Sequence, residues 1–288
     1  MYAPSAMPRP VPSNEGRTED ELRQHYEVEK ELAERLRDAT TSERRTLYTA
    51  LYNELLTRVP RHPQLTMKVD PEATAAVVRA QLQMLEHYVR PDSTFLEIGA
   101  GDCALSIALA PRVAHVYALE VSEEVVRDVS MPENGTVLIS DGVDIPVDDR
   151  SVDLAYSNQV MEHLHPDDAQ AQLENIRRAL KPGGVYVCIT PNRLTGPHDI
   201  SAYFDDVPTG FHLREYSVGS MTKTFRGAGF DSVRVLVGAR DRFAAVPAWP
   251  VAALEAGLGR LGPETRRMLV RRLRLNALLG IRVVARVR

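Results

Sequence analysis

The segment around two closely spaced glycines is the first place where this chain could bind a ligand. Glu97 precedes Gly99, Ala100 and Gly101 in the run FLEIGAGDCA, which predicts a strand that passes through a glycine turn into a helix. Glycines let the backbone of such a turn approach a ligand closely, with the amino end of a helix behind it. Glu97 stands where a strand should carry an apolar side chain, and a buried carboxylate needs a donor or a cation. An ammonium group on the ligand would meet that need.

Polar side chains follow the next three apolar runs of the chain. Glu120, with Val121 after it, ends the second run, and its carboxylate could accept two ribose hydroxyl groups. Asp141 and Gly142 follow the third run, where the acid could accept an adenine amino group, and Asn158 follows the fourth. Because open α/β sheets bind ligands at the carboxyl ends of their strands, these residues predict one binding edge.

The glycine turn by itself leaves a second interpretation open. Gly99, Gly101 and Ala104 also satisfy the G-x-G-x-x-G/A pattern of dinucleotide-binding folds, so a nicotinamide-dependent oxidoreductase is an alternative. Glu97 and Asp141 argue against it, because a pyrophosphate would be a poor neighbour for these carboxylates.

A parallel sheet would bring these residues to one edge. From Thr94 onward, short apolar runs alternate with helical segments, which is typical of βαβ units. The pattern predicts strands at Thr94–Ile98, Val113–Glu120, Thr136–Ser140, Val152–Ser157, Gly184–Thr190, Ser232–Val237 and Gly280–Val287. It predicts helices after a Ser122 cap, from Pro166 to Leu180, near Ser217–Ala228 and in a basic segment at about 249–275.

The first 70 residues have a different character. Residues 1–18 are rich in Pro, Ser and Asn and predict a disordered leader, whereas 19–70 carry leucines at three- and four-residue intervals and predict a helical extension. Asp70-Pro71-Glu72 predicts the start of a helix that runs to about Val89 and opens the main domain, 71–288. The extension could be a lid, a dimer surface or simple packing.

Composition excludes several classes of protein. The chain has 288 residues, 44% hydrophobic and 26% charged, so collagen-like, disordered and coiled-coil proteins are set aside. A net charge of −4 gives no chain-wide basic field, and nucleic acid is not an expected partner. No apolar run is long enough to span a membrane. Two cysteines without a CxxC pair predict neither a disulfide framework nor a zinc site, so we expect a cytoplasmic protein.

Taken together, these motifs resemble the class I S-adenosylmethionine-dependent methyltransferases of the small-molecule type, over roughly Ala73 to Arg288. The glycine turn, the acids after the second and third strands, the Glu162-His163-Leu164 step and the Leu180-Lys181-Pro182-Gly183-Gly184 turn stand in the family's order and spacing. The resemblance implies a three-layer, Rossmann-like α/β fold whose seven-stranded sheet has the order 3-2-1-4-5-7-6, with the last strand antiparallel. Cys103 departs from the pattern where the family often has a third glycine.

The resemblance also implies S-adenosylmethionine as cofactor and S-adenosylhomocysteine as product. It places Glu97 near the methionine end, the glycine turn beneath the cofactor, Glu120 on the ribose, Asp141 beside adenine and Asn158 at the reactive centre. The cofactor-binding residues that we predict are therefore Glu97, Gly99, Ala100, Gly101, Glu120, Val121, Asp141, Gly142 and Asn158.

Methyl transfer to a hydroxyl group requires that its proton be removed, and histidine is the natural base near neutral pH. The candidate catalytic residues are His163 after the fourth strand and His198 and His212 in the loop Pro191–Tyr216, which we expect to recognise the acceptor. The leading hypothesis is O-methylation of a small molecule, a sugar or a secondary metabolite of natural product biosynthesis. N- or C-methylation and a non-catalytic cofactor-binding protein are the alternatives.

A metal ion is a further alternative, which the sequence does not favour. Some methyltransferases similar to this chain bind a divalent ion through E-x-x-E-H and a distal histidine. Here Gln159 occupies the first position, which leaves Glu162 and His163 with His198 or His212. Because the loss of a carboxylate weakens a site for a hard cation, no metal ligand is predicted.

Overall fold

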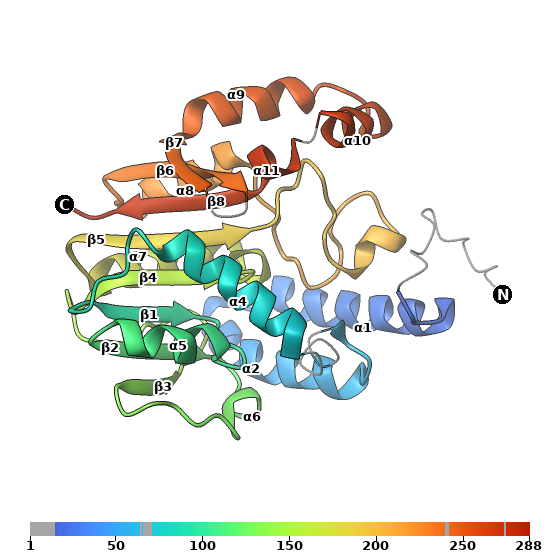
Figure 1. The fold of residues 1–288 in the computed structure, drawn as a ribbon. Helices are drawn as coiled ribbons and strands as arrows, with labels where there is room; N and C mark the ends of the chain where they lie inside the picture. Colours follow the sequence, from blue (N-terminus) through green and yellow to red (C-terminus); the bar gives the residue numbers. More distant parts are fainter. Residues whose placement is uncertain (1–14, 64, 66–70, 240–241, 274) are drawn as a thin grey trace.

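The computed structural model describes residues 15–63, 65, 71–239, 242–273 and 275–288, which form one mixed sheet with helices on both faces (Figure 1). The sheet has eight strands in the order β3-β2-β1-β4-β5-β8-β6-β7. Strands β1 to β5 are mutually parallel, and β8 runs antiparallel to both of its neighbours, β5 and β6. The strands are β1 (Thr94–Ile98), β2 (His115–Glu120), β3 (Gly135–Ile139), β4 (Val152–Asn158), β5 (Leu180–Thr190), β6 (Ser232–Ala239), β7 (Arg242–Pro247) and β8 (Ile281–Arg286).

This topology confirms the predicted α/β class and strand order, with one correction: the sheet has eight strands and not seven. The additional strand, β7, pairs antiparallel with β6 and forms the outer edge of the sheet. The sequence analysis assigned no strand to this apolar segment. It becomes a strand because β6 has a free edge beside it, and at Gly238 a Cβ atom would lie 2.0 Å from the carbonyl oxygen of Arg242.

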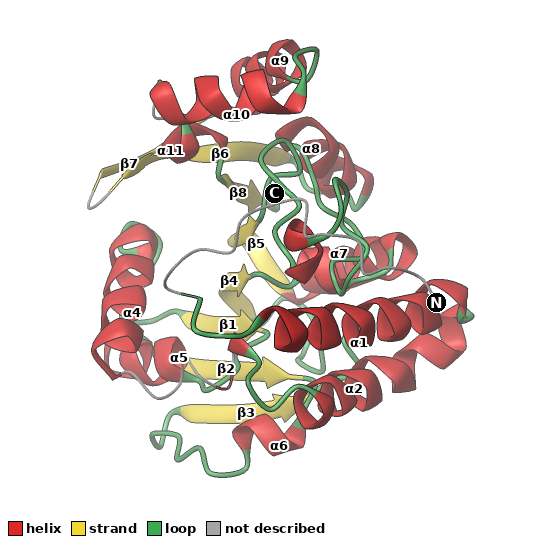
Figure 2. Cartoon of the chain, turned by 90° about the vertical axis from the view of Figure 1, so that its right-hand side faces the viewer, coloured by secondary structure: helices red, strands yellow, loops and turns green. Residues whose placement is uncertain are grey.

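The helices divide between the two faces of the sheet (Figure 2). α4 and α5 cover one face and pack on one apolar cluster, whereas α7 and α8 cover the other and pack on a second cluster that also includes residues of α1 and α2. Three helices, α9 to α11, are inserted between β7 and β8. The helices are α1 (Glu19–Asp38), α2 (Thr41–Arg58), α4 (Pro71–Leu85), α5 (Ala104–Leu109), α6 (Glu123–Val126), α7 (Pro166–Ala179), α8 (Val218–Gly227), α9 (Ala248–Leu258), α10 (Pro263–Arg272) and α11 (Asn276–Leu279).

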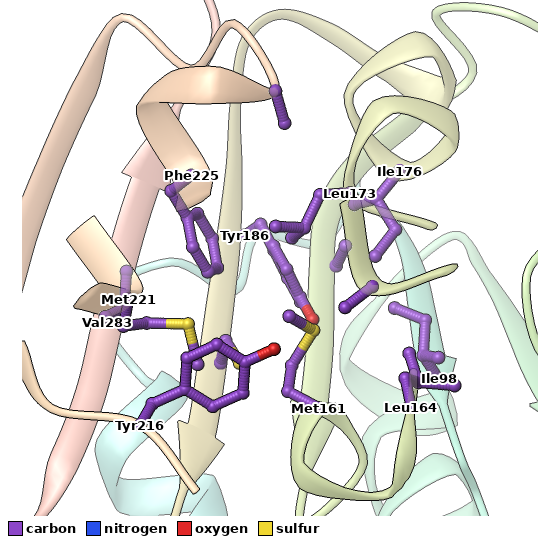
Figure 3. Packing of buried hydrophobic residues seen from close by; sticks show 14 of the residues in the cluster. Ile98, Met161, Leu164, Leu173, Ile176, Tyr186, Tyr216, Met221, Phe225 and Val283 are labelled. Atoms are coloured by element: carbon purple, nitrogen blue, oxygen red, sulfur yellow. The ribbon is translucent and has the colours of Figure 1, made fainter. Parts of the chain in front are cut away.

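Buried aromatic residues fill the larger cluster between the sheet and its helices (Figure 3). The ring of Tyr186 on β5 stacks on Phe225 of α8 with 5.5 Å between ring centroids, and Leu173 and Ile176 of α7 are fully buried. The apolar stripe predicted for α7 therefore faces the sheet. This packing holds β4 and β5, whose carboxyl ends carry polar residues, in a fixed position.

Most predicted elements are present, with small differences at their ends. α4 ends at Leu85 instead of Val89, and the predicted cap Asp70 lies outside the described residues. Residues 1–14 of the predicted leader also lie outside the described residues. The prediction that the Ser122 side chain caps a helix is wrong. Its hydroxyl donates to Asn53 of α2 (2.7 Å) and makes no cap bond to α6, which is only four residues long.

Capping boxes define the start of both helices of the extension. Thr18 caps α1 with Glu21, and Thr40 caps α2 with Glu43, so two backbone N–H groups at the start of each helix are paired. In Figure 1 the two helices lie beyond the arrowheads of the parallel strands, which are the carboxyl ends of those strands. The extension is therefore placed at the edge of the sheet where the sequence predicts a ligand. No helix among the described residues is long and apolar enough to cross a membrane.

A buried ion pair fastens α2 to α7. Asp168 on α7 accepts hydrogen bonds from Arg44 (Nη2 to Oδ1, 3.0 Å) and from the Tyr48 hydroxyl (2.6 Å), both on α2. The side chains of Arg44 and Asp168 are 4% and 1% exposed. Loss of one partner from such a pair leaves the other charge buried without compensation.

We predict that Asp168→Ala lowers the free energy of unfolding by about 3 kcal/mol, because it strands the Arg44 guanidinium and the Tyr48 hydroxyl. Chemical denaturation measures the change. Asp167→Ala is the matched control, since this neighbouring carboxylate is 76% exposed and its removal should cost no more than about 0.5 kcal/mol. Equal losses in the two variants would contradict the role of the ion pair.

Candidate functional site

A cavity of about 480 Å³ lies at the carboxyl ends of β1 to β4. Its floor is made by the turns after these strands, and its walls come from α2 and α4. Tyr48, Tyr52 and Leu56 border it from α2, and Val77 and Gln81 border it from α4. The second helix of the N-terminal extension therefore borders the cavity.

The glycine turn after β1 approaches the cavity as the sequence predicts. Gly99 has a φ of +70°, and a Cβ atom built there would lie 2.5 Å from Cγ2 of Val160, so only glycine fits this position. Gly101 also has a positive φ, of +56°. Cys103 takes the left-handed conformation too (φ 58°), which explains why a glycine suits the position where this chain departs from the family pattern.

Glu97 is 6% exposed and borders this cavity. Its Oε2 accepts hydrogen bonds from the backbone N–H (3.1 Å) and the hydroxyl (2.6 Å) of Ser106 on α5. Burial raises the pKa of Glu97 to about 8, with a further contribution from the nearby charges of Asp102 and Glu120. The side chain is therefore mainly protonated at neutral pH, and a cation placed beside it would ionise it.

Glu120, at the end of β2, is hydrogen-bonded to the glycine turn after β1. Its Oε2 accepts the N–H of Gly101 (2.8 Å) and its Oε1 the N–H of Val121 (2.8 Å), and the residue borders the cavity. Oε1 also accepts the N–H of Ser122 (3.4 Å), so of the two acceptor sites on each carboxylate oxygen, one on Oε2 stays available to a ligand hydroxyl group. The geometry is compatible with the predicted ribose contact.

Asp141 is not brought to the cavity, although Gly142 beside it is. The Asp141 carboxylate accepts the N–H groups of Val143 (2.9 Å) and Asp144 (2.7 Å) and pairs with Arg45 of α2 (2.5 Å). These bonds shape the loop after β3 and leave one acceptor site on Oδ2, so the predicted contact with adenine stays a prediction. Sequence reasoning missed Arg45, which lies 96 positions away.

His163 is the one candidate catalytic histidine that borders the cavity among the described lining residues. It lies on a 3₁₀ turn after β4 (Met161–His163), and its Nδ1 is 3.0 Å from the carbonyl oxygen of Phe211. Because a carbonyl only accepts, Nδ1 carries the proton and Nε2 keeps its lone pair. Burial and the adjacent His212 lower the pKa of His163 to about 3, so the ring is neutral near pH 7.

His212 stands behind His163, with 4.9 Å between the ring centroids. Its Nδ1 is 2.9 Å from Oε1 of Glu215. Burial lowers the pKa of His212, but the hydrogen bond to Glu215 and the charges of Glu162 and Asp199 outweigh it, so the pKa lies above its usual value. His212 is 6% exposed and does not border the cavity.

His198 lies apart from this pair. It is exposed, and its Nε2 is 3.0 Å from the Thr195 hydroxyl and 3.1 Å from the carbonyl oxygen of Asn192. Of the loop predicted to recognise the acceptor, Phe211 alone borders the cavity among the described residues. The remaining contacts of this loop are made with its own residues, with α1, with the turn after β4 and with α9 and α11. Asn192, for example, donates to the carbonyl oxygen of Leu279 in α11 (2.6 Å).

Glu29 of α1 holds Phe211 in place. Its Oε2 accepts the N–H of Phe211 (3.0 Å), and its Oε1 lies 2.7 Å from Nε2 of His25. Burial raises the pKa of Glu29, but hydrogen bonds to His25 and His62 outweigh it and hold the pKa well below its usual range. Sequence reasoning missed this residue, whose signal is a carboxylate four positions after His25 on the apolar face of a helix.

Two clusters of side chains among the described residues could hold a metal ion. In the first, formed by His25, Glu29 and His62, Arg17 donates to Nδ1 of His25 (2.8 Å), so the proton of His25 sits on Nε2 and faces Glu29. That nitrogen has no lone pair for a metal. The cluster is an ion-paired anchor for α1.

The second cluster consists of Glu162, His163 and His212, whose ligand atoms lie within 4.8 Å of one another. Both histidines direct Nδ1 at an acceptor, which leaves Nε2 of each able to bind a cation. Oε1 of Glu162 is buried without a hydrogen-bond partner, and burial raises the pKa of Glu162 to about 7. The donor set therefore fits a divalent transition-metal ion better than the sequence suggested.

Comparison with known proteins identifies the central part of the chain. Residues 96–188 match a family model described as a methyltransferase domain. A probable S-adenosylmethionine-dependent methyltransferase of Mycolicibacterium smegmatis is 35% identical over 138 residues, 47% of this chain and 51% of the relative. A Mycobacterium tuberculosis protein of the same description is 30% identical over 139 residues, 48% of each. The chain thus spans about half the length of the curated relatives it matches.

Solved structures with a similar fold carry related descriptions. One is a putative methyltransferase in complex with the Haloferax volcanii Trm112 methyltransferase activator, with a TM-score of 0.52, 22% identity, and 75% of this chain and 94% of that chain covered. Another is a phosphoethanolamine N-methyltransferase of Haemonchus contortus with S-adenosylhomocysteine, with a TM-score of 0.50, 20% identity, and 64% and 40% covered. These two likenesses concern the fold alone.

We predict that His163 stays neutral, with its proton on Nδ1, from pH 8 down to pH 5, because its pKa lies near 3. His212 should become protonated at a higher pH than a free histidine. Imidazole nitrogen spectra of ¹⁵N-histidine-labelled protein measure both, with His163→Gln used to assign the signal. Protonation of His163 above pH 5 would contradict the effect of its burial and of His212 on its pKa, and a neutral ring with its proton on Nε2 would contradict the hydrogen bond to Phe211.

Proposed function

We propose that this chain, which contains a class I S-adenosylmethionine-dependent methyltransferase domain, methylates a hydroxyl group of a small molecule. S-adenosylmethionine supplies a methyl group on a sulfonium, and an acceptor oxygen displaces the sulfur in line. The remaining tasks of the protein are to position the acceptor and the methyl group, to exclude water and to remove one proton. A sugar or a secondary metabolite of natural product biosynthesis is the acceptor class that we propose, in the cytoplasm. A homodimer remains a prediction.

The residues around the cavity fit this cofactor. Glu97 offers a buried carboxylate to its ammonium group, and Gly99 provides a surface that any Cβ atom would obstruct. Glu120 stands next along the edge for the ribose. Asn158, at the end of β4, borders the same cavity on the side of His163.

The observation that carries the proposal is the state of His163. It borders the cavity as a neutral ring whose free Nε2 can accept the proton of an acceptor hydroxyl group. His212 lies behind it, and the hydrogen bond from His212 to Glu215 favours a proton on the His212 ring. Apolar side chains such as Leu56, Val77 and Phe211 keep water from the reaction.

N- or C-methylation remains an alternative, because an amine or a carbanion can attack without a strong base. The phosphoethanolamine N-methyltransferase 1 of Triticum aestivum, 30% identical over 98 residues that cover 32% of this chain and 20% of that protein, belongs to the first kind. Identification of the methylated atom in the product separates these reactions.

A metal-assisted reaction is the second candidate, favoured by the unpartnered Oε1 of Glu162 and by the free Nε2 atoms of His163 and His212. A divalent ion held by these three residues would polarise the acceptor and lower the pKa of its hydroxyl group. In that case His163 would serve as a ligand instead of a base.

We predict that binding of S-adenosylhomocysteine at pH 7 releases most of one proton, because Glu97 has a pKa of about 8 and ionises beside the ligand ammonium. The pKa is raised in the free protein, so affinity falls as the pH drops below 8. Calorimetric titration in buffers of different ionisation enthalpy measures the release. Glu97→Gln is the control and should bind weakly with no release, and a buffer-independent enthalpy in the wild type would refute the assignment.

We predict that His163→Gln lowers the rate of methyl transfer to a hydroxyl acceptor about 100-fold, the lower end for loss of a general base, while affinity for S-adenosylhomocysteine is retained. Methyl-labelled S-adenosylmethionine with a panel of hydroxylated and amine acceptors provides the assay. His198→Gln is the matched control, since this exposed ring is outside the cavity.

The same assay separates the base from the metal. If a strong chelator leaves the wild-type rate unchanged, His163 acts as the base. If the chelator abolishes the rate and Mn²⁺ or Co²⁺ restores it, the metal-assisted reaction is correct. A normal rate in His163→Gln would rule out both.

A further inference from the structure

The end of the cavity at β3 lacks the acceptor that the sequence predicted for it. Asp141 accepts two backbone N–H groups and pairs with Arg45, and it does not border the cavity. The N–H of Gly142 is also engaged, because it donates to the Ser140 hydroxyl (3.1 Å). An adenine base at this end would need another partner for its amino group.

Gln172 of α7 is such a partner. The residue is 2% exposed and borders the cavity. Its Nε2 donates to the carbonyl oxygen of Gly142 (2.7 Å), which fixes the orientation of the amide, since a carbonyl only accepts. Its Oε1 is buried without a hydrogen-bond partner. A buried acceptor of this kind is costly in the free protein and is satisfied by a ligand N–H.

The order of the strands determines which part of the ligand meets Gln172. β3 is the outermost strand beside β2, Glu120 ends β2, and Gly142 follows β3. A nucleoside whose ribose lies on Glu120 therefore extends its base toward Gly142 and Gln172. Tyr48 borders this end of the cavity, because a Cβ atom at Gly142 would lie 3.1 Å from its ring.

We propose that Oε1 of Gln172 accepts the amino group of the cofactor's adenine, the role that the sequence assigned to Asp141. This inference rests on the proposed function, since it presupposes that the cavity binds S-adenosylmethionine. Asp141 is then a positioning residue that joins the loop after β3 to α2. The fixed amide also selects the base: a 6-oxo purine would direct an acceptor at Oε1, and the amide cannot turn over without losing its bond to Gly142.

The test is the ratio of dissociation constants for S-adenosylhomocysteine and S-inosylhomocysteine, measured by calorimetry. Wild-type protein should prefer the adenine ligand by about 10-fold or more. Gln172→Leu should weaken binding of the adenine ligand about 10-fold and bring the ratio close to one. A thermal unfolding midpoint of Gln172→Leu close to that of the wild type guards against a misfolded leucine variant.

Asp141→Asn is the matched control. It should leave the ratio unchanged, and any loss of affinity should be equal for both ligands. A ratio that collapses in Asp141→Asn but not in Gln172→Leu would overturn the inference, and so would a wild-type protein that binds both ligands equally. Wild-type protein that binds neither ligand would instead refute the proposed function.

Discussion

The hydrogen bond between His163 Nδ1 and the carbonyl oxygen of Phe211 is the interaction on which the candidate site depends. It fixes the proton of His163 on Nδ1 and leaves the lone pair on Nε2. It also joins the turn after β4 to the long loop after β5. Phe211 is itself held by Glu29 of α1 (3.0 Å). The tautomer of His163 therefore depends on Glu29, a carboxylate of the extension that lies 134 positions earlier in the sequence.

The cavity is matched to a cation. Glu97 and Glu120 border it, and the described lining residues include neither Lys nor Arg. Burial keeps Glu97 largely protonated until a positive charge arrives, because an isolated carboxylate is costly in such surroundings. S-adenosylmethionine carries both an ammonium and a sulfonium group, and its product has lost the sulfonium charge. Attraction to the site is thus stronger before transfer than after it, which assists product release.

The sequence predicted those features of the fold that depend on residues close together in the chain. The strand, the glycine turn and Glu97 form one contiguous segment, and their shape follows from a positive φ and a close approach to Val160. Regular alternation of strands and helices predicted a parallel sheet, and the family resemblance implied the strand order. β7 escaped prediction because it exists only through pairing with β6, and a short apolar run carries no sign of its partner.

Contacts across the fold decide which polar atoms stay available to a ligand. Asp141 has the expected position after β3, and Arg45 and the backbone of its own loop take three of the four acceptor sites on its carboxylate. Gln172 lies on a helix face where its spacing indicates packing, and only the bond to Gly142 reveals an unused oxygen. The residue type at a motif position therefore predicts where a polar side chain stands in the fold. Contacts with distant residues decide which of its atoms remain free to bind a ligand.

The same reasoning explains why the relatives do not reveal the acceptor. The matched segment, 96–188, contains the glycine turn, the acids and His163, which form the floor of the cavity. Its walls come from α2 and α4, before that segment, and from Phe211, after it. The residues that we propose for cofactor binding lie within the shared part, whereas these walls lie outside it. We therefore expect the extension and the loop of this chain to contribute to selection of the acceptor, and Glu29 of α1 connects the two through its bond to Phe211.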